Sequence, residues 1–154
     1  MADTYTQLYI QVVFAVQRRE RLIDPIWEDD LYKYITGIVQ QKNQSLLAIN
    51  GVPDHIHLLI RIKPNCNLSD LVREIKKAST NYINDRKLSP IRFSWQNGFG
   101  AFSYNNRDVD LIIGYIKKQK QHHQEKNFRK EYLELLDEFE IDYKEEYLFD
   151  WIDS

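Results

Sequence analysis

The chain has 154 residues, of which 43% are hydrophobic and 29% are charged, and this suits one globular domain with its own core. Its apolar runs are too short to cross a bilayer, its N-terminus lacks a signal-peptide pattern, and its single cysteine excludes an internal disulfide, so we expect a cytoplasmic protein without a membrane span. The net charge of −2 excludes a uniformly basic nucleic-acid binder.

Charge is nevertheless unevenly distributed along the chain. Residues 61–92 carry eight Lys or Arg against three Asp or Glu, residues 107–130 carry seven against three, and residues 131–154 carry one against ten. A basic middle and an acidic end fit a local phosphate-binding surface. Lys and Arg on solvated helix faces give the same pattern without any partner, so the charge alone leaves both interpretations open.

The hydrophobic pattern predicts the element order β-α-β-β-α-β followed by further helices. Alternation predicts strands at about 5–16, at 45–50, from His55 to the turn at Pro64, and at 91–95. Apolar stripes predict helices from Pro25 to about Lys42, from a cap at Asn67 or Ser69 to the break at Ser89, from Arg107 onward, and from Phe128 to about Phe139. The Gly-rich aromatic stretch 96–104 is expected to be a loop, which suits base stacking and packing on the core equally.

This order is the split βαβ pattern of ferredoxin-like and RNA-recognition folds. We therefore expect an α+β protein with an antiparallel sheet, helices on one face of that sheet, and extra C-terminal helices. The expected single domain covers residues 1–154, with a core at about 5–123 and a C-terminal helix and acidic tail at 124–154.

Two of the four histidines lie two positions apart in the third predicted strand. Because strand side chains alternate between faces, Ile56 and Leu58 are expected to face the core, while His55 and His57 share the outer face. Two imidazoles side by side form half of a metal site, although a strand histidine is more often a satisfied polar residue. On an outer face, the imidazole of His57 could be removed at little cost in stability.

The helix that begins near Arg107 supplies a second group of polar side chains. Tyr115 and Gln119 lie one turn apart on one flank of it, and His122 continues that flank. Two imidazoles and an amide oxygen can hold a divalent ion with open positions, and such an ion can polarise a phosphodiester. A tyrosine hydroxyl can act as a nucleophile and form a covalent intermediate.

Basic side chains on two helices could hold a polyanion beside these groups. The candidates for DNA contacts are Arg73, Lys76, Lys77, Lys117, Lys118 and His122.

Several short motifs, taken together in their order along the chain, indicate a particular protein family. The strand motif His55-Ile56-His57, the stretch Gly98–Ser103 and the run Tyr115-Ile116-Lys117-Lys118-Gln119 resemble the single-tyrosine HUH transposases of small insertion sequences. That group, which is IS200-like, includes the REP-associated tyrosine transposases. The resemblance covers nearly the whole chain.

The resemblance implies a DNA strand-transfer enzyme that cuts and rejoins single-stranded DNA beside hairpins at element ends, without ATP. Tyr115 would attack a phosphodiester and give a 5′-phosphotyrosine and a free 3′-OH. His55, His57 and Gln119 would bind the ion, Mg²⁺ or Mn²⁺. The resemblance assigns no catalytic role to His122, which we instead expect to orient a ligand or to contact DNA. The resemblance further implies a homodimer in which the tyrosine of one subunit completes the histidine site of the other.

Two other interpretations remain open. A non-catalytic or domesticated single-stranded nucleic-acid-binding protein could use the same sheet and basic helices, but it would not need the histidines, the tyrosine and the glutamine together. A replication or conjugation nickase would usually carry additional domains.

Overall fold

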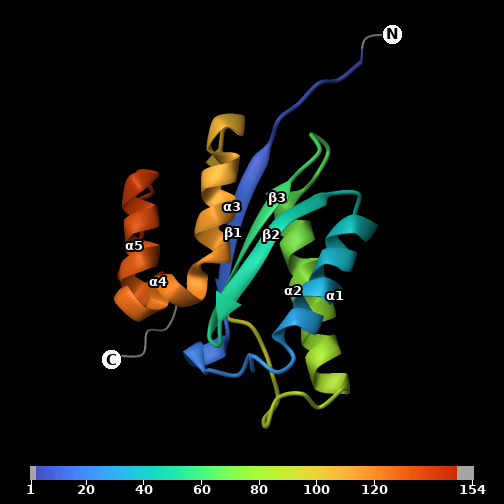
Figure 1. The fold of residues 1–154 in the computed structure, drawn as a ribbon, viewed down its shortest axis with the longest axis vertical. Helices are drawn as coiled ribbons and strands as arrows, with labels where there is room; N and C mark the ends of the chain where they lie inside the picture. The colour runs from blue at the N-terminus through green and yellow to red at the C-terminus, as the bar shows by residue number, and fades with distance from the viewer. Residues whose placement is uncertain (1–2, 149–154) are drawn as a thin grey trace.

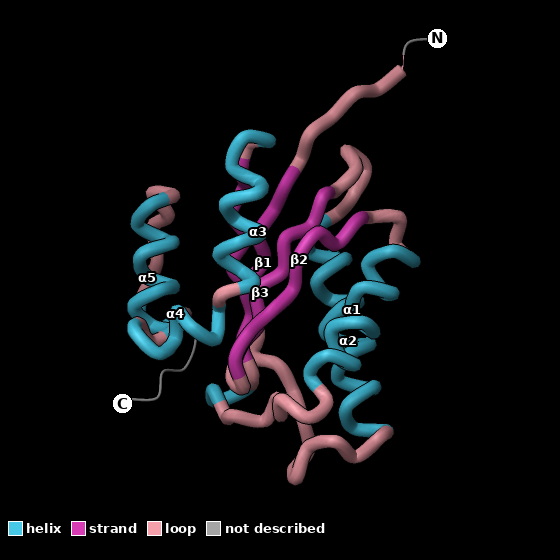
Figure 2. The backbone as a smooth tube through the Cα atoms, in the orientation of Figure 1, coloured by secondary structure: helices cyan, strands magenta, loops and turns pink. Residues whose placement is uncertain are grey.

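The computed structural model describes residues 3–148, except for the side chains of His122, Gln124, Glu125 and Tyr147. In chain order the elements are β1 (Tyr9–Ala15), η1 (Gln17–Arg19), α1 (Glu28–Gln41), β2 (Ser45–Val52), β3 (His55–Arg61), α2 (Leu68–Asp85), β4 (Gly100–Tyr104), η2 (Asn106–Asp108), α3 (Val109–Lys117), α4 (Gln119–Glu125), α5 (Phe128–Glu138) and η3 (Glu145–Tyr147), where η marks a 3₁₀-helix. The predicted order is confirmed, and Figure 2 shows where helices and strands alternate. Within the described range, no helix is both long and apolar enough to cross a membrane.

The four strands form one antiparallel sheet in the order β2-β3-β1-β4, which is the ferredoxin-like order. Helices α1 and α2 cover one face of the sheet, whereas α3 and α5 lie on its other side (Figure 1). The expected α+β fold is therefore confirmed. The expectation of helices on one face holds for α1 and α2, and the extra C-terminal helices cover the opposite face.

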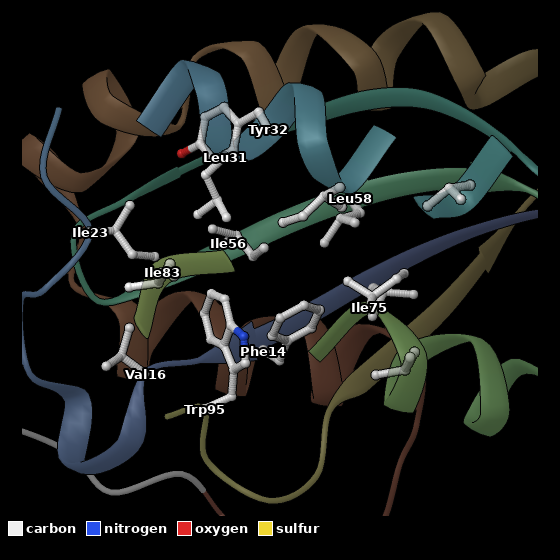
Figure 3. Packing of buried hydrophobic residues seen from close by; sticks show 14 of the residues in the cluster. Phe14, Val16, Ile23, Leu31, Tyr32, Ile56, Leu58, Ile75, Ile83 and Trp95 are labelled. Carbon is white, nitrogen blue, oxygen red and sulfur yellow. The ribbon is translucent and has the colours of Figure 1, made fainter. Parts of the chain in front are cut away.

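The main core lies between the sheet and the layer of α1 and α2. Side chains of Phe14, Ile56 and Leu58 from the sheet meet Leu31 of α1 and Ile75 of α2 there (Figure 3). The alternation of apolar residues in β1 and β3 correctly predicts this face, because residues two positions apart in a strand point the same way.

Two smaller apolar clusters lie on the opposite face of the sheet. Ile116 of α3 packs against Leu59 of β3 in one of them. Phe128 and Tyr132 of α5 pack against Val13 of β1 in the other. The two clusters leave a seam between α3 and α5, and the polar side chains of β1 and β3 lie in that seam.

Two predicted elements are wrong in detail. The fourth strand is Gly100–Tyr104 and not residues 91–95, where Trp95 alone bridges to Val16. A Cβ at Gly100 would stand 2.6 Å from the Tyr132 hydroxyl, so the glycine that suggests a loop is instead required by the close approach of α5. The single helix expected from Arg107 is also interrupted, because α3 ends at Lys117 and α4 begins at Gln119.

The β2-β3 pair that carries the histidines depends on a glycine. Gly51 lies opposite Ile56, and a Cβ there would stand 2.2 Å from the carbonyl oxygen of His55. We expect Gly51→Ala to destabilise the protein by about 1–3 kcal/mol, as overpacking does, and to lower the midpoint of urea unfolding. Gly37→Ala in α1, where a Cβ would meet nothing within 4 Å, is the control and should stabilise by about 0.5–1 kcal/mol. A Gly51→Ala protein as stable as the wild type would contradict this strand packing.

Candidate active site

Both histidines of β3 point to the face covered by α3 and α5. The side chains of His55 and His57 are fully buried, and the ring of Phe128 stacks on that of His55 with centroids 3.8 Å apart. The expectation of an outward, solvent-facing pair is therefore wrong, because the C-terminal helices close over this face. Removing either imidazole would leave its buried partners without their contacts, so such a change would reduce the stability of the protein.

Both imidazole rings are held through Nδ1. His55 Nδ1 lies 2.7 Å from Oδ1 of Asp54, and His57 Nδ1 lies 2.8 Å from Oε1 of Gln11. The amide orientation of Gln11 is set by its Nε2, which donates to the Tyr104 hydroxyl at 2.8 Å. Both partners of Nδ1 are oxygen acceptors, so Nδ1 of each ring donates to them, and Nε2 of each ring is directed at the carboxylate of Glu131.

Asp54 connects the histidine strand to the loop after β1. Its other carboxylate oxygen accepts from Nη2 of Arg19 at 2.8 Å, and Arg19 has a φ of 51°. Burial alone would raise the pKa of Asp54, but the hydrogen bonds and charges of His55 and Arg19 lower it to about 2. Burial alone would likewise lower the pKa of His55, whereas Asp54 and Glu131 raise it.

Glu131 of α5 stands at the centre of the site. Its Oε1 lies 3.1 Å from Nε2 of His57, 3.1 Å from Nε2 of His123 and 3.6 Å from Nε2 of His55. Only 3% of this side chain is exposed. Burial alone would raise the pKa of the carboxyl, but the surrounding imidazoles lower it, so Glu131 is a carboxylate.

The tyrosine and the glutamine of the predicted site meet the same carboxylate. The Tyr115 hydroxyl donates to Oε2 of Glu131, and Nε2 of Gln119 donates to that oxygen at 3.2 Å. Burial and the Glu131 charge raise the pKa of the Tyr115 phenol. The ring centroids of Tyr115 and His57 are 6.1 Å apart. The break between α3 and α4 thus leaves all four predicted residues, His55, His57, Tyr115 and Gln119, together within one chain.

The structure divides the candidate DNA contacts between two places. Arg73, Lys76 and Lys77 line a cavity of about 510 Å³ beside α2, in the helix layer opposite the histidines. Burial lowers the pKa of Lys76 to about 8, and its Nζ donates to the carbonyls of Gln96 and Gly98 at 2.8 and 2.7 Å.

The other candidates lie close to the site. Lys117 and Lys118 are exposed where α3 meets α4, between Tyr115 and Gln119. The side chain of His122 lies outside the described part of the structure.

Two central residues of the site, His123 and Glu131, are not among the sequence-predicted candidates. The sequence does contain one indication that Glu131 is buried. Phe128, Tyr132 and Leu135 form the buried stripe of α5, and Glu131 lies within that stripe. A charged residue on a buried stripe requires a partner, and buried imidazoles are such partners.

The sheet order and the histidine strand beside a tyrosine-bearing helix define the class of protein: a ferredoxin-like α+β domain with a His-X-His strand and a tyrosine next to it. More specifically, the chain belongs to the family Transposase IS200 like, whose model matches residues 4–119. The match includes His55, His57, Tyr115 and Gln119, and it confirms the family that the sequence motifs resemble.

Individual relatives agree with this assignment. The ISDra2 transposase TnpA of Deinococcus radiodurans is 27% identical over 73 residues, which are 47% of this chain and 52% of that protein. The chain thus matches about half the length of this curated relative.

Solved structures share the fold. A candidate transposase from Deinococcus radiodurans, 21% identical, superposes with a TM-score of 0.61 over 77% of this chain and 95% of its own. A REP-associated tyrosine transposase bound to a REP hairpin, 20% identical, superposes with a TM-score of 0.58 over 80% and 74%.

The buried Asp54 carboxylate predicts a pH-dependent difference in stability. Because its pKa falls from 3.8 to about 2 on folding, its contribution is complete above its unfolded pKa and is lost as the pH falls through about 2. We expect Asp54→Asn to reduce the free energy of unfolding near pH 6 and the difference from wild type to shrink between pH ~4 and ~2. Urea unfolding across this range measures it. Asp70→Asn, which removes an exposed partner of Arg73, is the control and should show little difference at any pH. A pH-independent effect of Asp54→Asn would contradict the lowered pKa.

Proposed function

We propose that this protein is a DNA transposase that cuts and rejoins single-stranded DNA at hairpin-flanked ends through a 5′-phosphotyrosine intermediate, with a divalent ion and without ATP. The proposal is supported by family membership and by one observation in particular. The Tyr115 hydroxyl and the Nε2 atoms of His55 and His57 converge on one buried carboxylate within a single chain. A nucleophile and an ion-binding pair are thereby close enough to act on the same phosphodiester.

The ion is proposed to be Mg²⁺ or Mn²⁺, held by His55, His57 and Gln119. Two observations support a cation here. Among the described residues, His55 Nε2 and Gln119 Oε1 are buried polar atoms without a hydrogen-bond partner, and both lie on side chains that border Glu131. When bound, the ion would stabilise the negative charge that develops on the phosphodiester.

The protein groups account for the covalent step. The Tyr115 oxygen would form a bond to phosphorus while the bond from phosphorus to the 3′ oxygen breaks, which leaves a 3′-OH. Oε2 of Glu131 accepts the hydrogen bond of the phenol and so orients the hydroxyl. The phenol proton would pass to water, and the leaving 3′ oxygen would take up a proton from water. Exposed Lys117 and Lys118 next to Tyr115 are proposed to contact the backbone phosphates. The hairpin-bound REP-associated relative supports a hairpin as the DNA partner.

The covalent intermediate is the first prediction of this proposal. Tyr115→Phe should abolish the protein–DNA adduct seen on a denaturing gel after incubation with hairpin-containing single-stranded DNA and Mn²⁺, and it should leave single-strand binding intact. Tyr82→Phe, a change on α2 in the opposite layer, is the control and should retain the adduct. An adduct that persists in Tyr115→Phe would reject Tyr115 as the nucleophile. Binding by the wild type without any adduct would favour the non-catalytic interpretation.

The assembly of the site within one chain is the second prediction. Tyr115 lies beside the histidines of its own chain, whereas the shared-site homodimer implied by the resemblance would require α3 to be exchanged between subunits. We expect a mixture of Tyr115→Phe and His57→Ala proteins to form no adduct, because neither chain has a complete site. Wild-type protein mixed with either variant is the control. Adduct formation on the His57→Ala chain in the mixture would instead establish a shared site.

A further inference from the structure

We propose that His123 and Glu131 are ligands of the ion together with His55 and His57, so that the site holds a first-row transition metal in preference to Mg²⁺. This deepens the proposed function, because it concerns the ion of the same site. It adds two ligands from the C-terminal helices to the histidine pair of the strand.

The positions of the four side chains support a common ligand set. One ligand atom from each of His55, His57, His123 and Glu131 can be chosen so that all lie within 4.8 Å of one another. Atoms that bind one metal at about 2.0–2.2 Å must lie within roughly twice that distance of each other, so the spread requires only small adjustments. All four residues are buried or nearly so, which shields the site from water.

The contacts around the rings orient the ligand atoms. Nδ1 of His55 and Nδ1 of His57 each lie within hydrogen-bond distance of an oxygen atom, so the Nε2 atoms of both rings face the Glu131 carboxylate. A metal ion would take the place of protons on these nitrogens, because imidazole binds a metal through an unprotonated nitrogen. It would also provide a partner for Nε2 of His55, which has no hydrogen-bond partner among the described residues.

The chemistry of these donors determines which ion is preferred. Mg²⁺ favours oxygen ligands and keeps several of its waters, whereas imidazole nitrogen suits ions such as Zn²⁺, Ni²⁺ and Co²⁺. Three imidazoles and one carboxylate, with the amide oxygen of Gln119 as a further ligand, therefore favour a transition ion.

The additional ligands also have a distinctive position in the chain. His123 lies on α4 and Glu131 on α5, both beyond residue 119, where the match to the family ends. The C-terminal segment would thus contribute two of the ligands, in addition to packing on the sheet.

Equilibrium dialysis of the chelator-treated full-length protein against Co²⁺ alone, or against Mg²⁺ alone, tests this proposal without DNA. We expect one Co²⁺ per chain with a visible absorption spectrum that changes on coordination, and an affinity for Mg²⁺ at least tenfold weaker. Glu131→Gln and His123→Ala should each weaken Co²⁺ binding at least tenfold and alter the spectrum. Glu134→Gln, on the same helix but exposed and paired with Lys126, is the matched control and should bind as the wild type does.

Unchanged Co²⁺ affinity in both folded variants would overturn the proposed ligands, and equal affinity for Mg²⁺ and Co²⁺ would overturn the selectivity. If circular dichroism shows that Glu131→Gln does not fold, the His123→Ala variant alone tests the ligand set. The ring of His123 is partly exposed, so we expect its removal to disturb the packing less. The adduct assay separates the two proposals. An adduct without any effect of these variants on metal binding refutes the ligand set alone, and the expected metal binding without an adduct refutes the transposase reaction alone.

Discussion

The structure depends on the burial of one carboxylate. A glutamate that is 3% exposed loses nearly all of its hydration, and only close positive or hydrogen-bonding partners make this tolerable. Glu131 finds these partners on three other elements: the imidazoles of β3, the phenol of α3, and the amide and imidazole of α4. Helix α5 can therefore dock with its polar residue in place only where the strand and the two preceding helices are already arranged around it.

The site lies where apolar packing on that face is divided. Helix α3 covers β2 and β3 through Ile116, and α5 covers β1 through Phe128 and Tyr132. A continuous apolar layer would have no room for Gln11, His55 and their partners. The separation of the two helices thus creates a closed polar seam in which imidazoles are shielded from water, and electrostatic interactions in such a place are strong.

The sequence predicts the structure well where the repeat of a strand or a helix determines which face a side chain occupies. Strand alternation correctly separates Ile56 and Leu58 from His55 and His57. Tyr115 and Gln119 do reach the same carboxylate, although the helix assumed for their spacing is interrupted between them. The prediction from sequence fails where contacts between distant segments determine burial or secondary structure. The histidine face is buried because residues some seventy positions later fold over it, and Gly100 belongs to a strand because Tyr132 requires the space. No local pattern contains either fact.

The two oxygens of Glu131 connect the two halves of the proposed chemistry. Oε1 faces the imidazoles of His55, His57 and His123, while Oε2 accepts from Tyr115 and Gln119. The Glu131 side chain of α5 thus links the Tyr115 hydroxyl of α3 to the imidazoles of β3. A displacement of α5 would move this carboxylate relative to both, and reactivity depends steeply on such distances. The C-terminal helix is thus part of the site's geometry, although it lies outside the residues matched by the family.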